Sequence, residues 1–339
     1  MFWFDWMAAH MQLSSEILSP LQSDDSDEER GADEVGKLEY TEGQLGGGTS
    51  TVYQAAFNFV NSIVGAGIVG MPFAFRQAGL AVGVVLMIFV AWLINKSVQM
   101  LIATGLKVGH TDFETLGLKV LGKGAFVVTL LSMMTFAFGA MVAYLIVIGD
   151  SLPSIIFLAS GGVTIVSRTA CILISALSIV LPLCLAKDLS SLAWSSLVSI
   201  SADVLLVFIV VISAPSSAAA QGITFPPQGG YKLSDSGVFL GLGTLSFAFV
   251  CQHNSFIVFR SLAQPTQKNW SKVVNMSVGA AFFLCMLFGL SGYLAFGNTS
   301  QGDILLSFEP DSKAVAVARA FLAFTMALTY PQVRYCKML

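Results

Sequence analysis

Charged residues are scarce in this sequence. They make up 11% of its 339 residues, whereas hydrophobic residues make up 55%. A soluble domain carries about 25% charged residues, because its surface must interact with water. The scarcity argues against a soluble enzyme, a nucleic-acid-binding protein and a disordered chain. We therefore expect a protein whose main solvent is lipid.

Sequence motifs typical of disulfide frameworks, metal sites, nucleotide-binding sites and enzyme active sites are missing as well. The five cysteines lie in or beside apolar runs and form no CxxC pair, which argues against a disulfide framework or a zinc site. The absence of a GxxxxGK(S/T) motif argues against a nucleotide-driven pump. A membrane enzyme needs converging polar groups, and the apolar runs offer only His253 and Asp203 as candidates. We expect no enzyme activity, no resident cofactor and no nucleic-acid partner.

The charge that is present divides the chain into two parts. Residues 1–50 contain eleven acidic and two basic residues, and they end in a glycine-rich stretch. Such a segment cannot bury a core, so we expect a disordered acidic cytoplasmic tail. Residues 51–339 contain nine acidic and fifteen basic residues among long apolar runs, and we expect them to form the membrane domain.

Apolar runs of bilayer-spanning length, about 17–25 residues, recur along the membrane domain. Only helices suit such runs, because lipid satisfies no backbone hydrogen bond, so the fold class is an all-α polytopic membrane protein. Residues 151–167 contain Pro153 and a glycine pair, and we expect them to form a connection. About eight spans are predicted, at residues 51–75, 80–105, 124–149, 169–186, 189–214, 237–259, 273–296 and 314–332.

Lysine and arginine indicate the orientation of the chain. If the N-terminus is cytoplasmic, the inner segments carry eleven of these residues and the outer segments carry four. Basic residues concentrate on the cytoplasmic side, so we expect the N-terminus inside. The sequon at Asn298 then lies outside, where glycosylation is possible.

Two of the predicted spans contain interruptions. In the first, Gly65, Gly67 and Gly70 precede Pro72. A helix break near Gly65–Ile68 would free backbone carbonyls, which suit a cation, and backbone amides, which suit a carboxylate. A helix kink is the alternative. The sixth span carries early glycines and the polar cluster Gln252–Ser255. Paired interruptions of this kind point to the central site of a transporter.

Three segments carry a resemblance to a known family: NFVNSIVGAGIVGMPFAFRQAG, GAMVAYLIVIGDSLP and SFAFVCQHNSFIVFRSL. They resemble the amino acid/auxin permease family, in particular its sodium-coupled neutral amino acid transporters and vacuolar amino acid permeases. The resemblance implies a LeuT-type inverted-repeat fold and symport of small neutral amino acids with sodium or protons. It also implies a plasma, vacuolar or lysosomal membrane. The oligomeric state is open, and a monomer is the simplest expectation.

The resemblance also assigns candidate residues. Asn61 matches a first-span asparagine implicated in sodium coupling, and Thr325 or Thr329 resembles the threonine that completes the sodium site. The substrate-binding candidates are Gly65, Ala66 and Gly67 in the first span and Phe247, Phe249, Cys251 and His253 in the sixth.

Two features depart from the family pattern. Asp203 lies in the middle of the fifth span, where it is either a proton carrier or a structural carboxyl group. The chain ends at Leu339, just after the eighth span, so we expect the second repeat to be incomplete. This leaves two alternatives to transport: an amino acid sensor or regulator that does not transport, and a non-functional truncated product.

Overall fold

The computed structural model describes residues 48–161, 166–180, 192–223, 232, 235–309 and 312–335. Within these residues the chain is helical throughout, and its one β-type contact is an isolated bridge between Ser50 and Leu262. Nearly all of the predicted acidic tail lies outside the described residues. The prediction of an all-α protein is therefore confirmed for the described part.

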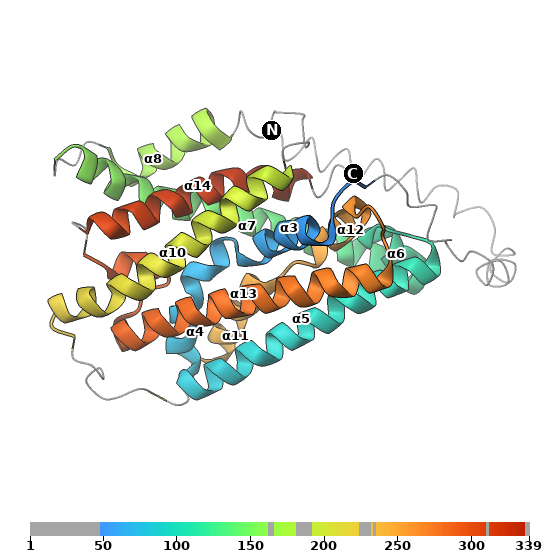
Figure 1. Cartoon of the computed structure of the whole chain (residues 1–339), viewed down its shortest axis with the longest axis horizontal. Coiled ribbons are helices and arrows are strands. Elements are labelled where there is room, and N and C mark those ends of the chain that lie inside the picture. The colour runs from blue at the N-terminus through green and yellow to red at the C-terminus, as the bar shows by residue number, and fades with distance from the viewer. Residues whose placement is uncertain are drawn as a thin grey trace, which may run out of the picture.

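The long helices lie side by side along the molecule, and shorter ones sit between or beside them (Figure 1). The first half contains α3 (Val52–Val64), η3 (Ala66–Gly70), α4 (Met71–Ala78), α5 (Leu80–Val108), α6 (Phe113–Leu121), α7 (Lys123–Ala159), α8 (Arg168–Ser175) and the π-helical turn η4 (Ala176–Val180). The second half contains α10 (Leu192–Ala220), α11 (Val238–Phe249), α12 (Gln252–Ser261), α13 (Gln267–Phe296), η5 (Gly297–Thr299), η6 (Ile304–Ser307) and α14 (Lys313–Tyr335).

Among the described residues, five helices are long and apolar enough to cross a membrane, or six if the bent pair α3 and α4 counts as one span. A helix lies at each of the eight predicted spans, but α8 and α14 are not among these five or six, and part of the predicted fourth span lies outside the described residues. One local expectation was wrong: α7 continues through Pro153 to Ala159, where a connection was predicted. Proline is tolerated inside membrane helices because neighbouring groups can satisfy the carbonyl that it frees.

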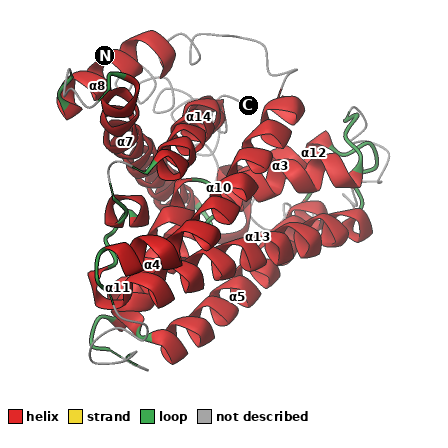
Figure 2. Cartoon of the chain, turned by 60° about the vertical axis from the view of Figure 1, so that its left-hand side comes forward, coloured by secondary structure: helices red, strands yellow, loops and turns green. Residues whose placement is uncertain are grey.

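Helix α13 organises the packing, because it contacts α3, α4, α5 and α10. Helix α14 packs against α7 and α10, so α10 joins the two groups of helices (Figure 2). The interrupted pairs α3–α4 and α11–α12 are held within this framework. Large side chains such as Phe59, Phe75, Phe288 and Trp270 are fully buried between the helices.

The contact between α13 and α4 depends on two glycines. A Cβ atom at Gly289 would lie 2.5 Å from the Phe75 ring, and one at Gly292 would lie 2.5 Å from the Pro72 ring. Small residues allow membrane helices to approach closely, which compensates for the weak hydrophobic force between helices in lipid. Gly279 lies on the same helix but faces open space.

This difference makes a matched pair of substitutions informative. We expect Gly289→Ala to destabilise the protein by about 1–3 kcal/mol, because the added methyl group overpacks the contact with Phe75. Gly279→Ala has no such neighbour and should be neutral or slightly stabilising. Thermal unfolding in detergent measures both, and equal melting temperatures for the two variants would contradict the packing argument.

Candidate functional site at two interrupted helices

The first interruption separates α3 from α4. Helix α3 ends at Val64, and Gly65 follows with φ 28° and ψ −152°. A positive φ favours glycine, because a side chain there would strain the backbone. The short η3 turn then leads into α4, and the two helical segments meet at an angle of 47°. The predicted break near Gly65–Ile68 is therefore present in the structure.

The second interruption separates α11 from α12. Helix α11 ends at Phe249, Val250 and Cys251 leave helical geometry, and α12 begins at Gln252. The break thus adjoins the predicted polar cluster. Of the early glycines, Gly241 has a packing role inside α11, where a Cβ atom would come within 2.9 Å of the Ala74 carbonyl oxygen, whereas a Cβ atom at Gly243 would meet no neighbour.

The two interruptions lie beside one another and are in direct contact. The Asn254 side-chain amide donates a hydrogen bond of 2.9 Å to the Ser62 hydroxyl, which ties α12 to α3. Ala248 packs so closely on η3 that a Cβ atom at Gly67 would lie 2.5 Å from its Cα atom. Helix ends with opposite partial charges therefore meet in one region, which suits a zwitterionic ligand.

A partly enclosed cavity lies at this meeting point. It is bounded by α3, η3, α7, α11, α12 and α14, so segments far apart in the sequence contribute to it. One side is aromatic: the Phe136 ring centroid lies 5.0 Å from that of His253 and 5.9 Å from that of Phe247. The lining residues are Ser62, Ile63, Gly65, Gly67, Phe136, Ala140, Tyr144, Phe247, Ala248, Val250, His253, Asn254 and Thr329.

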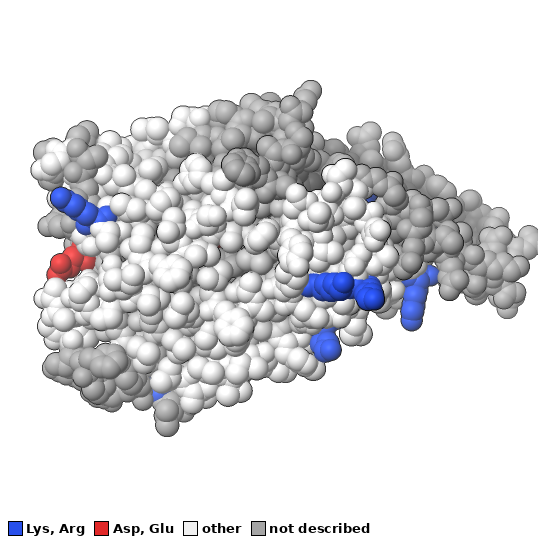
Figure 3. Space-filling view, viewed as in Figure 1, with Lys and Arg blue, Asp and Glu red and all other residues white. Residues whose placement is uncertain are grey.

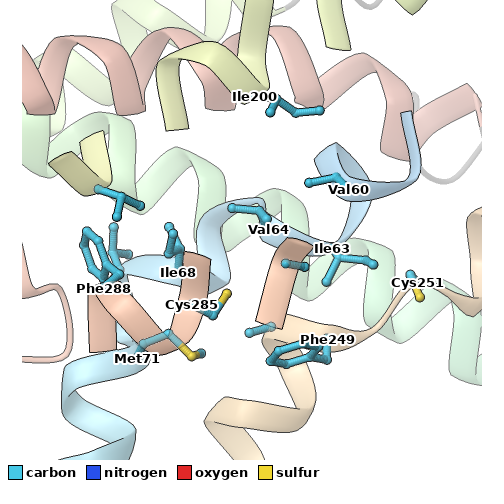
Figure 4. Packing of buried hydrophobic residues seen from close by; sticks show 14 of the residues in the cluster. Val60, Ile63, Val64, Ile68, Met71, Ile200, Phe249, Cys251, Cys285 and Phe288 are labelled. Atoms are coloured by element: carbon cyan, nitrogen blue, oxygen red, sulfur yellow. The ribbon is translucent and has the colours of Figure 1, made fainter. Parts of the chain in front are cut away.

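Most of the substrate-binding candidates lie at the cavity. Gly65, Gly67, Phe247 and His253 line it, and Ala66 belongs to η3, although nothing is described of its side chain. Phe249 and Cys251 do not line it. Both are fully buried and belong to the hydrophobic cluster between the helices (Figure 4).

Helical geometry explains this separation. Residues two apart point to opposite sides of a helix, so Phe247 and Phe249 cannot both face the cavity. Residues 247, 249, 251 and 253 would lie on one face only if the chain were extended. The chain leaves helical geometry only at Val250 and Cys251, so the expected continuous wall does not form.

The ion-coupling candidates occupy two places. Thr329 lines the cavity and donates a hydrogen bond of 2.8 Å to the Thr325 carbonyl oxygen one turn earlier. Asn61 is fully buried on α3 and does not line the cavity. Asp203 on α10 is 1% exposed, and its carboxyl group faces the Thr325 hydroxyl without reaching full hydrogen-bond geometry.

Sequence reasoning missed Phe136 and Tyr144, which α7 brings to the cavity. Together with Ala140 they recur every four residues, which is the spacing of one helix face. This spacing was the sequence signal that could have identified them. The Tyr144 hydroxyl would lie 3.4 Å from a Cβ atom at Gly65. This hydroxyl therefore points at the first interruption.

Asn298 lies beyond α13, in the short turn η5. Its side chain is exposed, in agreement with the geometry that glycosylation requires. The neighbouring Thr299 hydroxyl donates a hydrogen bond of 2.6 Å to the Phe296 carbonyl oxygen. Glycosylation at this site stays a prediction.

A partly buried acid lies at the same end of the bundle. The Asp303 carboxylate accepts a hydrogen bond of 2.9 Å from the Leu305 backbone amide, and the Leu305 carbonyl oxygen accepts one of 2.7 Å from Arg319. Burial raises the pKa of Asp303 from an ordinary value of 3.8 to about 6. The nearby Asp150 charge adds to the increase, whereas the Leu305 amide and the Arg319 charge oppose it.

This raised pKa gives a testable pH dependence. The folded protein holds the Asp303 proton more tightly than the unfolded chain, so stability falls as the pH rises from about 4 to about 6. The difference of about two pH units corresponds to about 3 kcal/mol, and we expect Asp303→Asn to remove it. Melting temperatures in detergent between pH 4 and 7 measure the effect.

Asp235, whose side chain is 27% exposed, supplies a control for this measurement. It pairs with Lys232 at 2.7 Å, and that hydrogen bond lowers the pKa of Asp235, so its pH dependence has the opposite sign. Asp235→Asn should leave the decline between pH 4 and 6 in place. An unchanged pH profile in the Asp303→Asn variant would contradict the assignment.

Comparison with known proteins identifies the family. The sequence profile described as "Transmembrane amino acid transporter protein" matches residues 48–336. The chain belongs to this family of transmembrane amino acid transporters. Since its members are transporters, the sequence-based expectation that the chain is not an enzyme is confirmed. With its membrane-length helices, the chain is a multi-pass membrane protein.

Three relatives in this transporter family show what share of each sequence is similar. "Putative sodium-coupled neutral amino acid transporter 11" of Rattus norvegicus is 31% identical over 84% of the chain and 63% of its own length. "Sodium-coupled neutral amino acid transporter 7" of Bos taurus is 29% identical over 87% of the chain and 65% of its own length. "Vacuolar amino acid transporter 2" of Saccharomyces cerevisiae is 27% identical over 83% of the chain and 60% of its own length. The chain thus spans less than two thirds of the length of these relatives.

Proposed function

We propose that this chain forms the substrate-binding core of a secondary active transporter for small neutral amino acids, coupled to sodium ions or protons. The observation that carries the proposal is the meeting of two interrupted helices at one cavity. The names of the relatives, which include sodium-coupled neutral amino acid transporters, support the substrate class.

The amino and carboxylate groups of the substrate would bind at the interruptions. Backbone amides at the start of η3 and α12 suit the carboxylate, and carbonyl groups at the end of α3 and α11 suit the ammonium group. The side chain of the substrate would then extend toward Phe136, Phe247 and His253. This wall carries no acidic residue, which favours a neutral side chain over a basic one.

Transport would follow from rocking of the bundle around this site, as in the LeuT-type arrangement that the sequence resemblance implies. The N-terminus would lie in the cytoplasm, in a plasma, vacuolar or lysosomal membrane. Coupling could use either of two sites. Asn61 and Thr329 offer oxygen atoms to sodium, whereas Asp203 beside Thr325 offers a carboxyl group to a proton.

Uptake by the reconstituted chain tests the proposal, with Phe247→Ala and Phe239→Ala as a matched pair. We expect uptake of L-alanine driven by a sodium or pH gradient. Phe247→Ala removes a cavity wall and should weaken apparent affinity about tenfold, or about 1.4 kcal/mol. Phe239 lies on the same helix and is 86% exposed, so Phe239→Ala should leave affinity unchanged.

Each outcome of this uptake experiment has a defined meaning. L-alanine binding without uptake would contradict transport and favour a sensor. Equal effects of the two phenylalanine substitutions would contradict the location of the site. Absence of both binding and uptake from a folded chain would contradict the substrate class.

A second pair of substitutions distinguishes the two coupling ions. Among the residues that the structure describes, Asp203 forms no ion pair. A buried carboxyl group without a cationic partner is costly when charged, so it is suited to carry a proton. If Asp203 carries the proton, Asp203→Asn should flatten the pH dependence of uptake while any sodium dependence persists. Asn61→Ala should instead weaken sodium dependence if that site is used. A pH profile unaltered by Asp203→Asn would return this residue to a structural role.

A further inference from the structure

A seam of polar side chains joins α5 to α13. The Asn95 side-chain amide donates a hydrogen bond of 3.0 Å to the Asn275 side-chain oxygen, and the Ser271 hydroxyl donates one of 3.3 Å to the Gln99 side-chain oxygen. Gln99 also donates hydrogen bonds to Asn95 and Asn275, at 2.6 Å and 3.3 Å. We call Asn95, Gln99, Ser271 and Asn275 the seam. Because Asn95 contacts Asn275 and Gln99 contacts Ser271, the seam fixes the antiparallel register of the two helices.

Three lysines flank the seam. Lys96 follows Asn95 on α5, whereas Lys268 and Lys272 lie in the first two turns of α13, and all three are exposed. The register places Lys96 and Lys272 within about one helical turn of the same depth. Neither these two nor Lys268 forms an ion pair with any residue that the structure describes.

The lysines lie on the surface that faces lipid. On α5, Lys96 is four residues from Trp92 and from Met100, which are 56% and 68% exposed and share its helix face. On α13, Lys272 is four residues from Met276, which is 43% exposed, and the same stripe continues to Phe283. Exposed apolar residues on membrane-length helices suit contact with acyl chains, and none of the residues that the structure describes forms an ion pair with these lysines, so we take lipid as their neighbour.

The surface also lacks opposite charge. In Figure 3, basic side chains gather at the end of the α5–α13 face that carries the start of α13, with no described acidic side chain among them. Two of the lysines lie near the end of the span, where lipid headgroups are found, and Lys96 can extend toward the same level. A lipid phosphate there would receive hydrogen bonds from ammonium groups and from seam amides.

We propose that Lys96, Lys268 and Lys272, together with the seam, form a binding site for the headgroup of an anionic phospholipid. The predicted orientation places the site in the cytoplasmic leaflet, where anionic lipids are concentrated. The binding site lies on the lipid-facing surface of α5 and α13, away from the cavity-lining residues. The proposal therefore does not depend on which substrate is transported.

Tryptophan quenching by brominated lipid tests this site, because Trp92 lies one turn from Lys96. The full chain is reconstituted in phosphatidylcholine that contains increasing brominated phosphatidylserine, and the quenching lost in a Trp92→Phe variant isolates the local signal. We expect brominated phosphatidylserine to quench Trp92 several-fold more effectively, per lipid added, than brominated phosphatidylcholine. Substituting all three lysines by glutamine should bring this ratio to about one.

A matched variant controls for total charge. Lys107, Lys119 and Lys123 are also exposed and also predicted to be cytoplasmic, so their triple substitution by glutamine removes the same charge elsewhere. It should keep the preference, as should substitution of the three site lysines by arginine. A preference that survives loss of the site lysines, or is lost equally in the control, would overturn the proposal. A wild-type chain without any preference would also overturn it and would assign the lysines to an acidic protein segment instead.

Discussion

A helix inside a bilayer can be interrupted only where protein surrounds the backbone groups that the break exposes, because lipid offers them no hydrogen bond. This constraint accounts for much of the arrangement described above. The breaks at Gly65 and at Val250–Cys251 lie against one another, and α7 and α14 close the space beside them. In the proposed function, the same backbone groups that are costly in lipid are the recognition elements for a zwitterion. The same arrangement of helices therefore both encloses the breaks and forms the candidate ligand site.

The close packing around the breaks follows from the same requirement. Helix α13 approaches α4 over Gly289 and Gly292, and α11 approaches η3 over Gly67. The outward faces of α5 and α13 carry large apolar side chains instead, interrupted by the polar seam and its three lysines. Small residues thus mark contacts between helices, whereas large apolar residues mark contact with lipid. The lysines mark the place on this face where we propose that an anionic headgroup binds.

The sequence alone predicted the membrane helices and the first interruption from local signals: run length, glycine next to proline, and polar residues in an apolar segment. The expectation that Gly65, Gly67, Phe247 and His253 share one site came from the resemblance to the permease family. Features that depend on which way each helix faces were harder to predict from the sequence. The burial of Phe249 and the inward face of α7 with Tyr144 required the position of each helix relative to its neighbours. The proximity of Asp203 to Thr325 required the contact between α10 and α14, which local sequence patterns do not show because the two helices are far apart in the chain.

The central claim is that the interruptions bind the amino and carboxylate groups of an amino acid. Competition for radiolabelled L-alanine on the purified chain tests it most directly, with L-alanine, its methyl ester and its N-acetyl derivative as competitors. The account predicts that unlabelled L-alanine competes and that both derivatives compete about a hundredfold less well, because each loses one charge that a helix end recognises. Equal competition by the ester and the free amino acid would contradict the claim, because the backbone amides would then have no part in recognition.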